Sequence, residues 1–164
     1  MLRTTLNRHL FESLSLKMNI KIASEEDKPE WLKLRMALWP DVSKEIHEKE
    51  ISEMLSKPER FITFIACDFP NHSIGFLEAS IHEIIDEGCV VKNIGYIEGW
   101  YIEPEYRKKG IGAELVKTAE KWASEKGLKE MAVDTNLDNI QSQSAYQALG
   151  YKEKDRFILY RKVL

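Results

Sequence analysis

The 164-residue sequence predicts a single α/β domain built around a mixed β-sheet. The first observation behind this prediction is the order of the segments, because short apolar runs typical of strands alternate with segments of helical periodicity. The second is length, since the chain suffices for one domain with its own core but not for two ordinary domains. The third is composition: hydrophobic residues at 43% and charged residues at 31% are typical of a globular protein.

Composition also argues against several classes of function. A net charge of -3 offers no bulk attraction for nucleic acid and suits cationic partners better. No apolar run reaches the length of a membrane span, so we expect no membrane partner. The two cysteines, Cys67 and Cys89, are too few for a disulfide framework and have no partner at metal-binding spacing. We therefore expect no metal site and a cytoplasmic location.

The first half of the chain begins with a segment of different character. Residues 1–17 precede a second methionine, Met18, and we expect them to be an N-terminal extension to a domain that spans residues 18–164. Ser24 and Asp27, followed by Pro29, predict a helix start. On that helix the residues at helical spacing are Trp31, Leu34, Arg35 and Leu38. The expected elements are a strand at 18–24, helices at 29–38 and 43–56, strands at 61–67 and 73–82, and a polar connection at 83–93.

The second half is predicted to contain a buried strand, a long helix and a shorter closing part. The strand runs from Ile94 to Ile102, and the helix after it ends at Gly127. The expected core residues of that helix are Ile111, Leu115, Ala119, Trp122 and Ala123. A short strand at 129–135 and a helix at 139–149 follow. One or two closing strands are expected within 151–163, with the core candidates Phe157, Leu159 and Tyr160.

The turn between the buried strand and the long helix is the first candidate binding site. It follows Pro104 and consists of Arg107, Lys108, Lys109, Gly110, Ile111 and Gly112. Free N–H groups at a helix N-terminus, the positive end of the helix dipole and nearby basic side chains together suit a phosphate or pyrophosphate. The two glycines would let a ligand approach the main chain without a Cβ in the way. Taken alone, these residues fit a solvated turn equally well.

A second pattern lies in the helix predicted at 139–149. Asn139, Ser142 and Tyr146 fall along one side, and Gly150 and Tyr151 follow. Taken alone, Tyr146 fits a core aromatic better than a functional one. Together, however, the two patterns resemble the signatures of the GNAT superfamily of N-acetyltransferases, an Arg-x-x-Gly-x-Gly turn and, downstream, an Asn, a small residue, a Tyr and Gly-Phe. Tyr151 stands in place of that Phe.

This resemblance implies a fold, a cosubstrate and a catalytic acid. The implied sheet is mostly antiparallel, is flanked by helices and has a central strand splayed from its neighbour, so that backbone N–H groups bind acetyl-coenzyme A and stabilise the oxyanion formed from its thioester. Tyr146 would donate a proton to the departing thiolate. The implied cofactor-binding residues are Tyr101, Ile102, Arg107, Lys108, Lys109, Gly110, Ile111, Gly112, Asn139, Ser142 and Tyr146.

Over residues 18–164 the chain is also similar to the aminoglycoside 6'-N-acetyltransferases. The stretches that carry this similarity include residues 38–41, 75–81, 95–101 and 134–139, whereas Val133 departs from the small residue usual there. The similarity implies a homodimeric resistance enzyme that acetylates the 6'-amino group of a cationic antibiotic. Neither signature contains a cysteine, which favours direct attack in a ternary complex over an acyl-enzyme intermediate.

Acidic residues on the predicted strands favour a polycationic acceptor. Glu78, Glu98 and Asp134 lie on strands that the implied fold brings toward one cleft, where carboxylates attract and orient ammonium groups. Glu98 is the candidate base, because burying a carboxylate in an apolar strand without a task is costly; an ordered water is the alternative. Trp39 could stack on a sugar ring or pack in the core, and its position before Pro40 and Asp41 resembles that of an acceptor-site tryptophan in this family, which favours contact. Asp138 is interpreted as a solvent-facing residue or part of an ion pair.

Two other functions remain open at this point. The acceptor could be another amine, such as a polyamine or a protein N-terminus, although the chain has no obvious insertion to form a peptide groove. A non-catalytic sensor of acyl-coenzyme A is the alternative from another class. A sensor could lose Tyr146 and the acidic residues, and this sequence has both.

Overall fold

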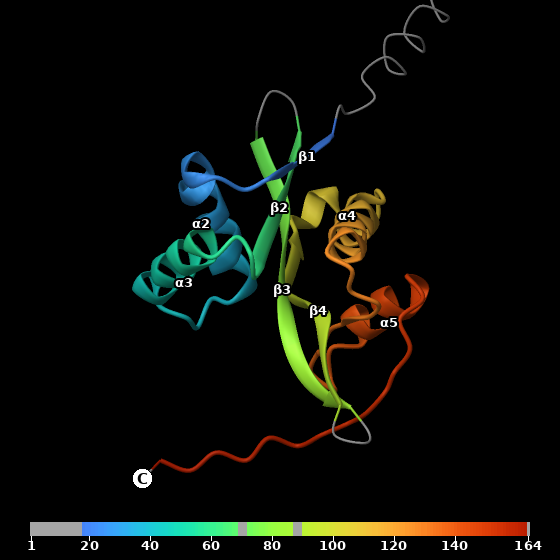
Figure 1. Ribbon diagram of the computed structural model, residues 1–164. Coiled ribbons are helices and arrows are strands. Elements are labelled where there is room, and N and C mark those ends of the chain that lie inside the picture. Colours follow the sequence, from blue (N-terminus) through green and yellow to red (C-terminus); the bar gives the residue numbers. More distant parts are fainter. Residues whose placement is uncertain (1–17, 69–71, 87–89, 164) are drawn as a thin grey trace, which may run out of the picture. The chain divides into compact units, whose positions relative to one another are not determined.

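The computed structural model describes residues 18–68, 72–86 and 90–163 (Figure 1). The predicted extension at 1–17 and Cys89 lie outside these residues. The chain divides into two compact units, one up to Val133 and one from Asp134 onward, and each is described by itself.

The first unit is built on a five-stranded sheet in the order β1-β2-β3-β4-β5. Its strands are β1 (Asn19–Ile22), β2 (Phe61–Asp68), β3 (His72–Asp86), β4 (Val90–Ile102) and β5 (Met131–Ala132). The first three pairs of neighbours are antiparallel, and β4 and β5 are parallel. The prediction of a mixed, mostly antiparallel sheet is therefore confirmed.

The β3–β4 hairpin is longer than the sequence predicts. Pairing continues from His82↔Ile94 through Glu83↔Asn93 and Ile84↔Lys92 to Asp86↔Val90. The predicted polar connection at 83–93 is thus wrong over most of its length. Charged side chains are compatible with a two-stranded ribbon because one or both of its faces remain in solvent, while the backbone hydrogen bonds are made between the strands.

At its other end, β4 extends beyond the residues that pair with β5. Its register with β5 consists of Gly95↔Met131 and Tyr96↔Ala132, and β4 continues beyond them to Ile102. The end of this pairing at Tyr96 is consistent with the splayed central strand that the resemblance implied. The strand predicted at 129–135 is correspondingly shorter, with two residues.

Helices cover both faces of the sheet (Figure 1). The helices α2 (Lys28–Leu38) and α3 (Lys44–Ser56) pack on one face, and α4 (Ile111–Glu125) packs on the other. All five core residues predicted for α4 are buried, and Gly127 ends that helix in the left-handed region with φ 80°. Ser24 and Asp27 form the predicted cap before α2, where Asp27 Oδ2 accepts hydrogen bonds from the Ser24 amide and hydroxyl.

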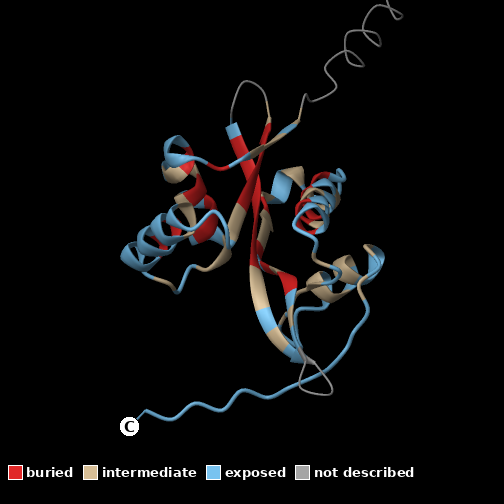
Figure 2. Cartoon of the chain, in the orientation of Figure 1, coloured by how far each residue is buried: buried red, intermediate tan, exposed pale blue. Residues whose placement is uncertain are grey.

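The core consists of apolar residues on both sides of β2 and β3, which are red over much of their length in Figure 2. On the α2 and α3 face, Trp31, Leu34 and Ile51 pack against Ile65 and Phe76. Their burial fixes these two helices on the sheet, because each large apolar side chain contributes about 1.5–3 kcal/mol when fully buried.

The second unit contains the helix α5 (Ile140–Ala148) and an extended segment after it. The closing strands predicted within 151–163 are absent from this described segment. Phe157 and Tyr160 are 69% and 86% exposed, and Leu159 is exposed as well, so their prediction as core residues is wrong (Figure 2). A strand needs a neighbouring edge for its N–H and C=O groups, and sequence pattern alone does not show whether the chain itself supplies one.

Candidate functional site

A cavity of about 370 Å³ lies on the α2 and α3 face of the first unit. Its described lining residues are Arg35, Trp39, Val42, His47, Glu50, Glu53, Met54, Phe61, Glu78 and Glu98. The predicted substrate residues Trp39, Glu78 and Glu98 are thus brought together. The lining holds four carboxylates and one guanidinium, so the cavity favours a cation.

Glu78 lies on β3 at the floor of this cavity and is 1% exposed. Arg35 Nη1 donates to both of its carboxylate oxygens at 2.8 Å, and Trp31 Nε1 donates to Oε1 at 2.6 Å. Burial raises the pKa of Glu78 to about 7, while Arg35 and Trp31 act in the opposite direction by favouring the charged form. Because Arg35 compensates its charge, Glu78 is held inside the protein and offers less to a ligand than the sequence predicted.

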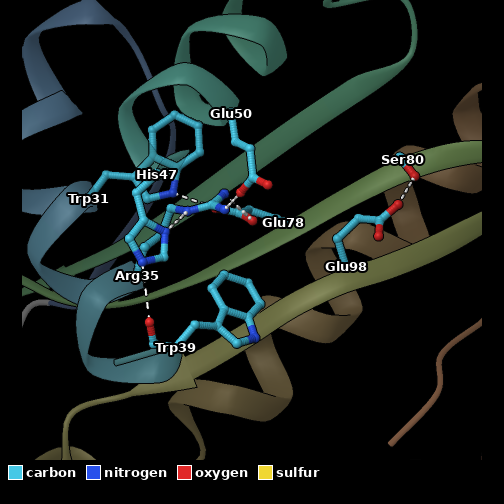
Figure 3. Close-up of polar contacts among 8 residues, drawn as sticks. All are labelled: Trp31, Arg35, Trp39, His47, Glu50, Glu78, Ser80 and Glu98. Atoms are coloured by element: carbon cyan, nitrogen blue, oxygen red, sulfur yellow. Dashed lines mark hydrogen bonds and ion pairs between the residues drawn. The ribbon is translucent and has the colours of Figure 1, made fainter. Parts of the chain in front are cut away.

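Arg35 joins three elements around Glu78 (Figure 3). Besides the bonds to Glu78 on β3, its Nη2 donates to Glu50 on α3 and its Nε donates to His47 Nδ1 at 3.3 Å. With Nδ1 accepting, the Nε2–H of His47 donates to the Trp39 carbonyl at 3.3 Å. The buried cluster therefore also fixes the start of the loop that follows α2.

Trp39 is held at the cavity by contacts on several sides. The Arg35 guanidinium lies 4.9 Å from the centroid of its ring, and the His47 ring is stacked with it at 6.3 Å. A Cβ at Gly99 would lie 2.4 Å from Trp39 Cη2, so the indole edge rests directly on β4 where a side chain is missing. This arrangement fixes a flat aromatic surface next to Glu98.

Glu98 occupies a β-bulge in β4. Glu78 pairs with Gly99 and Ala79 pairs with Ile97, which leaves Glu98 as the extra residue. A bulge redirects the side chain of the unpaired residue, and the Glu98 side chain is 35% exposed. The expectation that Glu98 is buried in an apolar strand is therefore wrong. Its Oε1 accepts a hydrogen bond from Ser80 Oγ at 2.5 Å (Figure 3). The same oxygen lies 2.7 Å from His82 Nε2.

The basic turn follows β4 and the short 3-10 helix η2 (Pro104–Tyr106). Lys108 has φ 60° and Gly110 has φ 83°, and α4 begins at Ile111. Such left-handed residues turn successive N–H groups toward one side, which with the helix start gives an anion-binding nest. A Cβ at Gly110 would meet no atom within 4 Å, so the approach to this turn is open.

Side chains of the turn are also used to build it. Arg107 is exposed, yet its Nε donates to the Ile102 carbonyl at 2.8 Å and its guanidinium lies 5.6 Å from the centroid of the Tyr101 ring. Gly112 is required for packing as well, because a Cβ there would lie 2.5 Å from Trp100 Cζ2. The sequence suggested a ligand as the reason for Gly112, and the structure adds the Trp100 indole.

The second unit carries the remaining predicted residues. Asn139 caps α5, with Oδ1 accepting from the Ser142 amide at 3.1 Å. Tyr146 is half-buried, and its ring packs at 60° to that of Tyr151. Burial and the charge of Asp134 raise the pKa of Tyr146 to about 12. The phenol is therefore protonated throughout the neutral range.

Sequence reasoning did not select Arg35, His47, Glu50, Ser80 or His82 as site residues. A signal for Arg35 was present, since it falls among the apolar positions of its helix while Glu78 interrupts an apolar strand. Two opposite charges at inward positions indicate a buried pair. In the described part of the chain, no group of three or more His, Cys, Asp and Glu residues is arranged to hold a metal ion.

Comparison with protein families gives one match, to the acetyltransferase (GNAT) family over residues 25–151. The chain belongs to the GNAT family. Among curated relatives of this GNAT protein, the aminoglycoside N(6')-acetyltransferase type 1 of Klebsiella aerogenes is 39% identical over 142 residues, covering 84% of this chain and 91% of that protein. The enzyme of the same name from Acinetobacter genomosp. 13 is 37% identical over 145 residues, covering 88% and 98%.

Solved structures also resemble this GNAT protein. AAC(6')-Iy in complex with the bisubstrate analogue CoA-S-monomethyl-acetylneamine has a TM-score of 0.81 at 33% identity, covering 90% of this chain and 99% of that one. The aminoglycoside 6'-N-acetyltransferase AAC(6')-Ih from Acinetobacter baumannii has a TM-score of 0.80 at 34% identity, with the same two coverages. The fold implied by the sequence resemblance is thereby confirmed.

The Arg35–Glu78 pair gives a stability prediction. Arg35→Ala leaves a buried carboxylate without its charge partner, so the free energy of unfolding should fall by roughly 3–5 kcal/mol in urea titrations. The matched control is Lys33→Ala on the same helix, whose side chain is 70% exposed and pairs with Glu30; it should change stability by less than about 0.5 kcal/mol. Equal effects of the two substitutions would contradict a structural role for the buried pair.

Proposed function

We propose that this GNAT protein transfers the acetyl group of acetyl-coenzyme A to the 6'-amino group of aminoglycosides, and so confers resistance to them. The observation that carries this proposal is the cavity in which carboxylates outnumber cations and Trp39 offers a flat face. A polycationic sugar derivative matches both features, because ammonium groups are attracted by the carboxylates and sugar rings stack on an indole. The names of the relatives support the same acceptor.

The cosubstrate is proposed to bind at the basic turn and along the end of β4. N–H groups of Gly110, Ile111 and Gly112, with the charges of Lys108 and Lys109, suit the pyrophosphate. The stretch of β4 beyond its pairing with β5, including Tyr101 and Ile102, would hold the pantetheine arm and orient the thioester. Arg107 supports this edge through its bond to the Ile102 carbonyl. Asn139 and Ser142 would bind the same cosubstrate from α5.

For the acceptor, the proposal assigns Glu98 and Trp39 to direct contact and keeps Asp134 as a further anionic contact. Glu98 suits this role because it is partly exposed, lines the cavity and has Oε2 turned away from the two bonds at Oε1. Glu78 adds negative charge at the floor, where Arg35 balances most of it. In this assignment Glu78 orients the site more than it binds the antibiotic.

The proposed reaction is a direct attack in a ternary complex. An acceptor ammonium gives a proton to Glu98, and the freed amine attacks the thioester carbonyl carbon, whose oxyanion the backbone N–H groups of β4 stabilise. As the new C–N bond forms and the C–S bond breaks, Tyr146 supplies a proton to the departing sulfur, and the second proton lost by the nitrogen restores the Tyr146 phenol. A pKa of about 12 keeps Tyr146 in the protonated form that this step needs.

The decisive assay measures release of the coenzyme A thiol from acetyl-coenzyme A with the purified protein. We expect turnover with kanamycin and tobramycin and none with an aminoglycoside that has a 6'-hydroxyl, because only an amine forms the amide. Spermidine tests the polyamine alternative. Turnover with spermidine alone would contradict the assigned acceptor, and tight coenzyme binding without turnover on any amine would identify a sensor.

Removal of one hydroxyl tests the catalytic acid. Tyr146→Phe should lower kcat by about 100-fold, the usual contribution of a positioned acid, and leave the affinity for acetyl-coenzyme A nearly unchanged. Up to about pH 10 the wild-type kcat should show no alkaline decline from this group, since it is still protonated there. Tyr160→Phe, in the exposed final segment, is the control. Retention of more than half the activity by Tyr146→Phe would exclude its role as the acid.

We also propose a cytoplasmic homodimer. The described part of the chain contains no helix with the length and apolar character to cross a bilayer. The final segment supports dimerisation, because it is extended and exposes Phe157, Ile158, Leu159 and Tyr160 without a strand partner among the described residues. An extended segment of this kind gains hydrogen bonds and apolar burial by pairing with a second copy.

Light scattering after size-exclusion chromatography tests the dimer. The wild-type protein should elute with twice the mass of one chain, and Phe157→Asp combined with Leu159→Asp should shift it toward the monomer, because charges oppose burial of the segment. Lys154→Asp combined with Lys162→Asp alters two charged positions of the same segment as a control. A monomeric wild-type protein, or a double aspartate variant that remains dimeric, would refute this mode of assembly.

A further inference from the structure

The carboxylate of Glu98 is held by two side chains from β3. Ser80 and His82 lie two residues apart on that strand and so share a face with Glu78. The Ser80 hydroxyl donates to Glu98 Oε1 at 2.5 Å, and His82 Nε2 lies 2.7 Å from the same oxygen. Since both contacts use Oε1, Oε2 can face a ligand. The position of the proposed base therefore depends on a serine and a histidine.

The imidazole of His82 is itself fixed in place. It stacks on the Tyr96 ring, with the centroids 4.4 Å apart and the planes 12° from parallel. An ionised carboxylate accepts hydrogen bonds only, so beside Glu98 the Nε2 atom of His82 carries a proton. In the neutral ring Nδ1 is then free of a proton, and the 35% exposure of the side chain gives solvent access to it.

We propose that His82 is a positioning residue for the Glu98 base, and that it permits catalysis when neutral and restrains it when protonated. This inference rests on the proposed function and on the role of Glu98 within it. A neutral His82 orients the carboxylate through one hydrogen bond. A protonated His82 forms an ion pair with Glu98, and a neighbouring positive charge makes a carboxylate a weaker base.

The proton balance keeps His82 unchanged during a turnover. A proton leaves the acceptor ammonium and binds Glu98 Oε2, the amine nitrogen bonds to the thioester carbon, and the proton passes from Glu98 to solvent after the product leaves. Throughout, His82 keeps the proton on Nε2. Its effect is exerted between turnovers, when Nδ1 gains or loses a proton.

Glu98 is the charged side chain that contacts His82 directly. From β4, Glu98 and the Tyr96 ring contact His82, while Lys92 pairs with Ile84 in the register and its Nζ lies 2.7 Å from Glu130. On the other side, β2 begins at Phe61 opposite Ser80, before it reaches His82, and the Arg60 guanidinium lies over the Phe61 ring.

The test compares His82→Gln with the wild-type protein over pH 5.5 to 8.5, with kcat/KM for tobramycin as the measurement. Glutamine keeps an N–H donor near the position of Nε2 but does not titrate. The amines of tobramycin titrate identically in both assays. Dividing kcat/KM of the wild type by that of the variant therefore removes the effect of substrate ionisation and leaves the effect of the substitution. We expect a ratio of about 3 at pH 8.5, from a less well placed hydrogen bond, and about 0.3 at pH 5.5, where protonation restrains only the wild type.

Two further variants make the test specific. His72→Gln replaces an exposed histidine that lies 3.4 Å from Asp68. For this variant the ratio of wild-type to variant kcat/KM should not change with pH. His47→Gln tests the buried histidine that lines the cavity, and circular dichroism at pH 5.5 checks that each variant is folded. A ratio for His82→Gln that stays constant with pH overturns the inference, as does a pH dependence that disappears in His47→Gln instead. Absence of wild-type turnover on aminoglycosides would refute the proposed function itself, whereas a constant ratio with normal turnover refutes the role of His82 alone.

Discussion

The buried ion pair between Arg35 and Glu78 is the interaction on which the candidate acceptor site depends. A carboxylate at 1% exposure is stable only when its charge is compensated, and Arg35 compensates it with Nη1 placed between the two oxygens. The remaining nitrogens of the same guanidinium bind His47 and Glu50. One side chain of α2 thereby ties α3 and β3 together, and the cavity is the space left between them.

This interaction also explains why carboxylates of one cavity differ in their chemistry. Glu78 has donors on both oxygens and a pKa raised by burial, so it acts as part of the framework. Glu98 emerges from a bulge, reaches solvent and has donors on one oxygen. Burial thus separates a structural carboxylate from one that is available to a ligand, although both stand in apolar stretches of the sequence.

The sequence predicted most of the fold because most of its signals are local. Helical spacing identified the buried face of α4, and the cap at Ser24 and the glycine after α4 marked helix ends. The final segment was mispredicted because a short apolar run such as 157–160 shows that a strand is possible without showing which edge it joins. The two glycine-bearing signatures and the acidic residues were found from pattern and resemblance.

Other features of the site depend on register, which no local pattern reveals. The bulge that exposes Glu98 is an offset between two strands, and it alone decides that this carboxylate meets Ser80 and His82. The Arg35 cluster likewise unites residues 43 positions apart in the sequence. For Arg35 and Glu78, the pairing could have been inferred from two opposite charges at inward positions. For His82, no signal in the sequence indicated the contact.

The bulge in β4 has a consequence for how such an enzyme changes over generations. In a regular ladder every side chain packs against a cross-strand neighbour, so a substitution that alters the chemistry also disturbs the sheet. Glu98 has no partner residue on β3 in the register. Its replacement therefore removes no ladder pair, but it takes the carboxylate away from the buried Ser80 hydroxyl and from His82 Nε2, so a change at position 98 calls for matching changes at positions 80 and 82.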